Sequence, residues 1–229
     1  MENHTINVPG AQEFARPRSR RDFFKSLAVA GAGATAASML LSGKASAQTD
    51  DVDIANFALT LEYLEADFYA RALDAGVLSG DALGVVENLA SHEAQHVDAL
   101  VGLIESVGAT PVEKPTLTFP TDAFSSQASI LDLAATFEPV GVGAYLGAAP
   151  LISSPDILAA AGSIEGVEGE HVVAINMLLG VVPYANEAFP KALTLDEVSA
   201  AVAPFLGGKM LSTGGPQLSP MEAYRLGHL

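Results

Sequence analysis

Two segments of the sequence place a glutamate three residues before a histidine, a spacing that suits metal binding. Glu93 and His96 form the first pair, and Glu168 and His171 form the second. On a helix, side chains three residues apart lie on one face, one turn apart. A carboxylate and an imidazole on one face are a ligand pair for a transition metal. Two solvent-exposed Glu–His pairs are the competing interpretation, and the upstream residues decide between the two.

Each pair follows a similar upstream segment. Glu62 is followed by Tyr69 and Glu138 by Tyr145, both at a spacing of seven residues. Seven residues are almost two helical turns, so each glutamate shares a face with its tyrosine. The chain therefore contains two copies of one unit, a helix with Glu and Tyr followed by a helix with Glu-x-x-His. Two such hairpins facing each other would bring four carboxylates and two imidazoles to one centre.

This pattern resembles the ferritin-like superfamily, which includes bacterioferritin, rubrerythrin and the manganese catalases. The run Leu59–Glu62 with Tyr69, and the tripeptide His96-Val97-Asp98, are similar to the first and second helices of bacterioferritin. The run Glu138–Pro150 is more similar to the exported, desiccation-related branch of the superfamily. The resemblance covers about residues 51 to 180.

The resemblance implies a carboxylate-bridged site that holds two Fe or two Mn ions. The ligands it implies are Glu62, Glu93, His96, Glu138, Glu168 and His171. Glu93 and Glu168 would bridge the ions, and each histidine would bind one of them. The two remaining glutamates would be terminal or bridging ligands.

Five other polar side chains lie near these positions in the sequence. Tyr69 and Tyr145 would donate hydrogen bonds to ligating carboxylates and hold their orientation. Ordinary core aromatics are the alternative for both tyrosines. We expect Glu65 and Asp67 to be exposed, and His92 to lie outside the ligand shell or at the surface.

The helical spacing and the capping signals predict an all-α fold, an antiparallel four-helix bundle of the ferritin-like type. We expect helices at about residues 51–75, 81–107, 126–147 and 155–180, with Asp50 or Asp51 capping the first and Gly76, Gly108 and Gly180 ending the first, second and fourth. A proline-rich segment at 109–124 would be the one long crossover, between helices two and three.

Helices three and four contain residues that weaken helices. Pro139 directly follows Glu138 and removes a backbone donor. We expect a kink or bulge at this position. We also expect glycines to allow close contact between helices, namely Gly141, Gly143, Gly162, Gly166 and Gly169.

The two ends of the chain differ in character from the bundle. Residues 1–47 resemble a twin-arginine signal peptide, with Arg20-Arg21, a weakly apolar run, and small residues ending at Ala47. A membrane anchor is the alternative for this segment. Residues 48–180 would form the bundle and residues 181–229 an irregular extension. Thr194 and Glu197 form a capping box, which predicts one short helix in that extension.

Composition limits the function. The chain has no cysteine, which excludes disulfides, cysteine zinc sites and iron–sulfur clusters. Cleavage after Ala47 would remove six basic and three acidic residues and take the net charge from −16 to −19. Such a surface repels nucleic acid and anionic lipid. We therefore expect a periplasmic or secreted protein whose mature chain has no nucleic-acid partner and no stable membrane insertion.

The pattern predicts an exported dinuclear metal protein that oxidises ferrous iron or consumes peroxide or oxygen in stress protection. Its partners would be metal ions and oxygen or peroxide, with a homo-oligomer as a possible assembly. Two alternatives stay open. One is an iron-binding or storage protein without turnover, and the other is a desiccation or stress protein in which the bundle is only structural.

Overall fold

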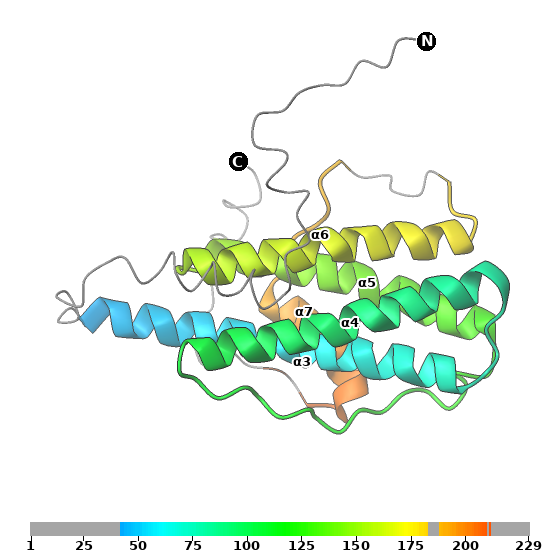
Figure 1. Cartoon of the computed structure of the whole chain (residues 1–229), viewed down its shortest axis with the longest axis horizontal. Coiled ribbons are helices and arrows are strands. Elements are labelled where there is room, and N and C mark those ends of the chain that lie inside the picture. The colour runs from blue at the N-terminus through cyan, green and yellow to red at the C-terminus, as the bar shows by residue number, and fades with distance from the viewer. Residues whose placement is uncertain (1–41, 183–187, 210, 212–229) are drawn as a thin grey trace, which may run out of the picture. The chain divides into compact units, whose positions relative to one another are not determined.

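A computed structural model describes residues 42–182, 188–209 and 211, with side chains from residue 51 onward, and is all-α over this range. Four long helices form a bundle, α3 (Ser42–Asp74), α4 (Gly80–Ser106), α5 (Gln127–Ala148) and α6 (Pro155–Leu178). Figure 1 shows α3 and α4 running in opposite directions, as do α5 and α6. The predicted all-α four-helix bundle is confirmed. Among the described helices, none combines the length and hydrophobicity that a membrane span requires.

The helix ends follow the predicted signals. Gly76, Gly108 and Gly180 have φ values of 65°, 80° and 70°, the left-handed conformation that terminates a helix. Ser154 caps α6 by accepting a hydrogen bond from the Ile157 amide, and a proline occupies the first turn. These local signals therefore placed the helix ends to within one or two residues.

The start of α3 differs from the prediction, and so does the role of Asp51. The sequence predicts a start near residue 51, but the Ala-containing segment before it continues the helix back to Ser42. Asp51 is buried within α3, and its carboxylate accepts hydrogen bonds of 2.8 Å from the amides of Ser153 and Ser154. It therefore fixes the start of α6 against α3. The predicted cleavage site after Ala47 falls within α3.

The connection between α4 and α5 runs along the bundle from one end to the other, as the predicted crossover requires (Figure 1). The Thr118 amide donates a 2.9 Å hydrogen bond to the carbonyl of Phe205. Aromatic rings from the bundle, the crossover and the extension pack together with centroids 4.8–6.4 Å apart, namely Phe68, Phe119, Phe124, Phe137 and Phe205. This aromatic cluster joins the three parts of the chain in one core.

The described part of the C-terminal extension packs on the bundle. A short 3₁₀ turn, η1 (Ala149–Leu151), follows α5, and the extension holds α7 (Leu195–Val202) and η2 (Ala203–Leu206). The predicted capping box at the start of α7 is present, because the side chains of Thr194 and Glu197 each accept from the other's amide. Val198, Val202 and Leu206 belong to the same buried core as α5. Residues 183–187, 210 and 212–229 lie outside the described residues.

Two glycines of α5, Gly143 and Gly147, allow a loop backbone to approach the helix closely. The Leu193 amide donates a 2.8 Å hydrogen bond to the Gly143 carbonyl, and a Cβ on Gly147 would lie 1.8 Å from the Leu193 carbonyl oxygen. Close contact with another helix, the predicted reason for Gly143, is therefore wrong. It is also wrong on α6, where a Cβ would meet no atom within 4 Å at Gly162, Gly166 or Gly169. α5 stays α-helical across its proline, so no bulge interrupts it.

Replacing Gly147 by alanine should destabilise the protein. The added Cβ would force the segment around Leu193 off α5, at a cost of about 1–3 kcal/mol. Thermal unfolding followed by circular dichroism should show a melting temperature lowered by about 5 °C. Gly162→Ala is the matched control, because its Cβ meets open space. The control should gain about 1 kcal/mol from helix propensity. Equal melting temperatures for the two variants would contradict the role assigned to Gly147.

Candidate metal centre

The six predicted ligands converge inside the bundle, and all are buried. They come from all four long helices and form two groups of ligand atoms. One group comprises Glu62, Glu93, His96 and Glu168. The other comprises Glu93, Glu138, Glu168 and His171. Within each group, one ligand atom from each residue lies within 4.8 Å of the others, and Glu93 and Glu168 belong to both groups.

Each histidine turns its Nδ1 atom toward its own group. His96 Nδ1 lies 3.2 Å from carboxylate oxygens of three residues, Glu62, Glu93 and Glu168. His171 Nδ1 lies 2.9 Å from Glu93 and 3.2 Å from Glu138. The imidazoles therefore meet the carboxylates at distances that suit either a shared proton or a shared cation.

The carboxylates govern the protonation of the two imidazoles in the metal-free protein. Burial alone would lower the pKa of His96, but the contacts with Glu168, Glu62 and Glu93 outweigh it and raise the pKa to about 12. The same balance raises the pKa of His171 to about 10. Both imidazoles are therefore protonated at neutral pH and supply positive charge among the carboxylates.

The carboxylates themselves have divergent pKa values. Burial raises the pKa of Glu62 to about 7, and it also raises the pKa values of Glu138 and Glu168. For Glu93 burial acts in the same direction, but close contacts with the two histidines outweigh it and lower the pKa to about 2. Divergent pKa values among buried, neighbouring carboxylates are typical of a functional site.

The residues fit a pair of metal ions. Glu93 Oε1 and both carboxylate oxygens of Glu168 are buried without a hydrogen-bond partner among the described residues. Glu93 Oε1 lies 2.9 Å from His171 Nδ1, and Glu168 Oε1 lies 3.2 Å from His96 Nδ1, but neither contact has hydrogen-bonding geometry. Buried carboxylate oxygens without a partner are costly, and a cation bound between them removes that cost. Carboxylates combined with imidazoles suit Fe and Mn.

The two tyrosines hold carboxylates across the bundle. The Tyr69 hydroxyl on α3 donates a hydrogen bond to Glu138 on α5. The Tyr145 hydroxyl on α5 donates one of 2.5 Å to Glu62 on α3. Both tyrosines are buried, so these hydrogen bonds fix the orientation of one carboxylate in each group. Each tyrosine therefore bonds to the glutamate of the other repeat, and not to the glutamate seven residues before it on its own helix.

Glu65 is the site residue that the sequence prediction missed, because the predicted exposure is wrong. The residue is only 4% exposed, and its Oε2 atom has no hydrogen-bond partner among the described residues. Burial, followed by repulsion from Glu168, raises its pKa well above the ordinary value. Its position three residues after Glu62 puts both on one helical face, but this spacing alone does not show that the face is buried at Glu65.

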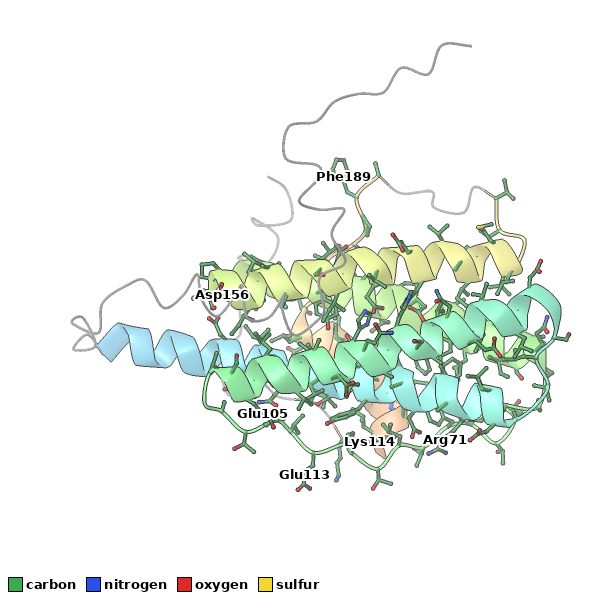
Figure 2. All side chains as sticks on the ribbon, viewed as in Figure 1. Arg71, Glu105, Glu113, Lys114, Asp156 and Phe189 are labelled. Carbon is green, nitrogen blue, oxygen red and sulfur yellow. The ribbon has the colours of Figure 1, made fainter. Side chains whose placement is uncertain are left out.

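Asp67, the other carboxylate predicted to be exposed, is partly buried and faces away from the centre. It contacts Arg71 at 2.7 Å and Lys114 at 2.5 Å. Both cationic residues are labelled in Figure 2, where Arg71 belongs to α3 and Lys114 to the connection between α4 and α5. Asp67 is therefore neutralised by its own partners, whereas the described ion pairs give Glu65 neither a lysine nor an arginine.

His92 lies behind His171 relative to the carboxylates. Its Nδ1 atom is 3.0 Å from His171 Nε2, and the two rings stack with centroids 5.2 Å apart. His171 thus presents one nitrogen to the carboxylates and the other to His92, which fixes its ring. Burial and the neighbouring imidazolium charges lower the pKa of His92. This place outside the ligand groups agrees with the sequence-based expectation.

Comparison with known proteins supports the fold. A solved structure of a conserved hypothetical protein from Mycobacterium tuberculosis is similar to this chain, with a TM-score of 0.51 and 18% identity. The match covers 62% of this chain and 98% of that one, and at this identity it shows the fold alone. No curated protein matches the chain. Residues 50–181 match the family model described as a ferritin-like domain, and the chain therefore belongs to that family.

Proposed function

We propose that this chain is an exported ferritin-like protein that binds two Fe or two Mn ions and uses them to oxidise ferrous iron or to consume peroxide. The observation that carries the proposal is the sharing of Glu93 and Glu168 by two groups of ligand atoms. These two glutamates would bridge the ions. The other four ligands would serve one ion each, namely Glu62 and His96 in one group and Glu138 and His171 in the other.

When bound, a pair of Fe or Mn ions supplies the capacity to exchange two electrons with oxygen or peroxide. The protein contributes position and charge. The four carboxylates offset the charge of two divalent cations, and the two histidines complete the ligand set with neutral nitrogen. Tyr69 and Tyr145 keep two of the carboxylates in place. The apolar shell around the centre limits the entry of water.

A small apolar cavity supports a small substrate. It has a volume of about 20 Å³ and is lined by residues that include Leu61, Ala144 and Tyr145. Tyr145 also holds Glu62, so the cavity lies one side chain away from the proposed ligands. The cavity leaves room for a small molecule, and its apolar lining suits oxygen.

The activity has a direct test. Protein loaded with iron should oxidise added ferrous ion in air, or protein loaded with manganese should consume hydrogen peroxide, faster than the same ions free in buffer. His171→Ala should lower the rate at least about 100-fold, because it removes a proposed ligand. Glu105→Gln is the control, since this α4 residue is exposed at the surface (Figure 2). Two bound ions with neither activity would favour the alternative of a metal-stabilised stress protein.

Export is a separate part of the proposal. Residues 1–47 resemble the signals of twin-arginine export, a pathway that carries proteins already folded. The centre could then be loaded before it meets copper and zinc, which outcompete iron and manganese. Replacing Arg20 and Arg21 with lysine should trap the precursor in the cytoplasm, as cell fractionation would show. Amino-terminal sequencing of the exported wild type tests cleavage after Ala47. Normal export of the double-lysine variant would rule out this route.

A further inference from the structure

Glu65 lies outside both ligand groups, yet it is buried beside them. Its carboxylate shares a small space with that of Glu168, and the space exists because residue 141 is glycine. A Cβ built on Gly141 would lie 2.8 Å from Glu168 Oε2 and 3.3 Å from Glu65 Oε1. The two carboxylates therefore enter from opposite helices, α3 and α6, into the volume that a side chain on α5 would fill.

The internal repeat makes this arrangement asymmetric. Glu65 follows Glu62 by three residues, and Gly141 follows Glu138 by three, so the two positions are equivalent in the two repeats. One repeat supplies a carboxylate, and the other supplies the room for it. The buried centre therefore holds five carboxylates instead of the four that the repeated pattern alone provides.

The charge of Glu65 has no partner outside the centre. Among the described residues, no lysine or arginine forms an ion pair with Glu65, and its Oε2 atom accepts no hydrogen bond. A buried carboxylate without a partner is costly unless a cation lies close to it. The side chain is aimed into the same space as Glu168, which is shared by both ligand groups, so a cation of the centre is the partner within reach.

We propose that Glu65 is a seventh ligand side chain of the centre, binding one of the two metal ions beside Glu168. The inference rests on the proposed metal centre and deepens it. It makes the two ions inequivalent, because only the repeat that contains α3 supplies the extra carboxylate. The ion bound by Glu65 would be held more tightly than it would be by the six-residue set alone.

Titration of the metal-free full chain with Co(II), followed by visible absorption, tests this proposal. The d–d bands of Co(II) report the ligands, and the titration reports the affinity of each ion. Three variants are compared with wild type. Glu65→Gln keeps the shape and removes the charge, Glu65→Asp keeps the charge and shortens the side chain, and Asp67→Asn is the control on the same helix. Circular dichroism establishes that each metal-free variant is folded.

If Glu65 is a ligand, Glu65→Gln and Glu65→Asp should each lower the affinity for one of the two Co(II) ions by roughly 10–100-fold. Each should also shift the absorption bands. Asp67→Asn should match wild type, because Asp67 contacts Arg71 and Lys114 at the surface. If Glu65→Gln fails to fold, Glu65→Asp carries the test.

Two results would overturn the ligand role. The first is a Glu65→Gln variant with the Co(II) affinity and absorption bands of wild type. The second is a Glu65→Gln variant with weaker affinity but unchanged bands, while Glu65→Asp has the affinity and bands of wild type. The second result would assign Glu65 a role through charge alone. A wild-type chain that binds no Co(II) would instead overturn the metal centre itself, and the role of Glu65 with it.

Discussion

Metal-free protein is expected to lose stability against unfolding as the pH rises from about 5 to about 8, whereas the stability of metal-loaded protein should stay constant or increase. The reason is that, in the absence of metal, protons neutralise the buried carboxylates that metal ions would otherwise neutralise. Glu62 shows the effect most directly, because its pKa is raised from 4.5 to about 7. The folded chain therefore binds this proton more tightly than the unfolded chain does.

The sign follows from linkage between protonation and folding. The stabilisation from the proton on Glu62 is fully present below pH 4.5 and is lost as the pH rises through about 7. His96 and His171 act in the same direction at higher pH, between 6.5 and their raised pKa values of about 12 and about 10. Glu93 acts in the opposite direction, but only as the pH falls from 4.5 through about 2. Above pH 5 the lowered pKa of His92 opposes them, but only up to about pH 6.5, and it is one group against several with raised pKa values.

Bound metal should reverse this trend. Ions that bind only the native state stabilise it by mass action, and their affinity rises with pH as the ligands lose their protons. Verified removal of metal at pH 8 should lower the melting temperature by about 10 °C or more. Thermal unfolding at three pH values, with chelator and with Mn(II), measures both trends. Glu62→Gln should flatten part of the slope in the metal-free protein. Superimposable melting curves with and without bound metal would count against the centre.

The number of bound ions should depend on which ligand is removed. Glu93→Gln or Glu168→Gln should reduce two ions to none, because each glutamate belongs to both ligand groups. His96→Ala or His171→Ala should reduce two ions to one, because each histidine belongs to a single group. Elemental analysis after loading with Mn(II) or Fe(II) and gel filtration measures the ratio of metal to protein.

A matched control is available on α6. Glu170 lies two residues after Glu168 but is exposed, so Glu170→Gln should retain both ions. The shared position of the two glutamates would be contradicted if their variants retained one ion, or if either histidine variant lost both. Circular dichroism of each variant separates loss of metal from loss of fold.

The ligand pattern was predictable because it depends on local geometry. A spacing of three or seven residues fixes which side chains share a helical face, whatever surrounds the helix. The Glu–His pairs and the glutamates upstream of them could therefore be predicted from the sequence, as could the helix ends at Gly76, Gly108 and Gly180. The capping box of α7 was found for the same reason, since it involves residues three apart.

What the sequence did not provide depends on contacts between distant segments. Glu65 is buried because a glycine on α5 leaves space for its carboxylate, and no pattern within α3 contains that information. Asp51 binds the amides of Ser153 and Ser154, about a hundred residues away, so its local appearance as a helix cap misled. The loop at Leu193 explains Gly143 and Gly147 of α5 in the same way.

The two ligand groups have a consequence for the order of events in folding. Each group takes three side chains from one helical hairpin and one from the other, since Glu168 enters the first group and Glu93 the second. Contacts within a hairpin are close in sequence and form early, while the docking of the hairpins must wait for the crossover to close. Metal can therefore complete its ligand set only after docking. In a chain without cysteine, the pair of ions then acts as a late cross-link that slows unfolding and leaves the folding rate almost unchanged.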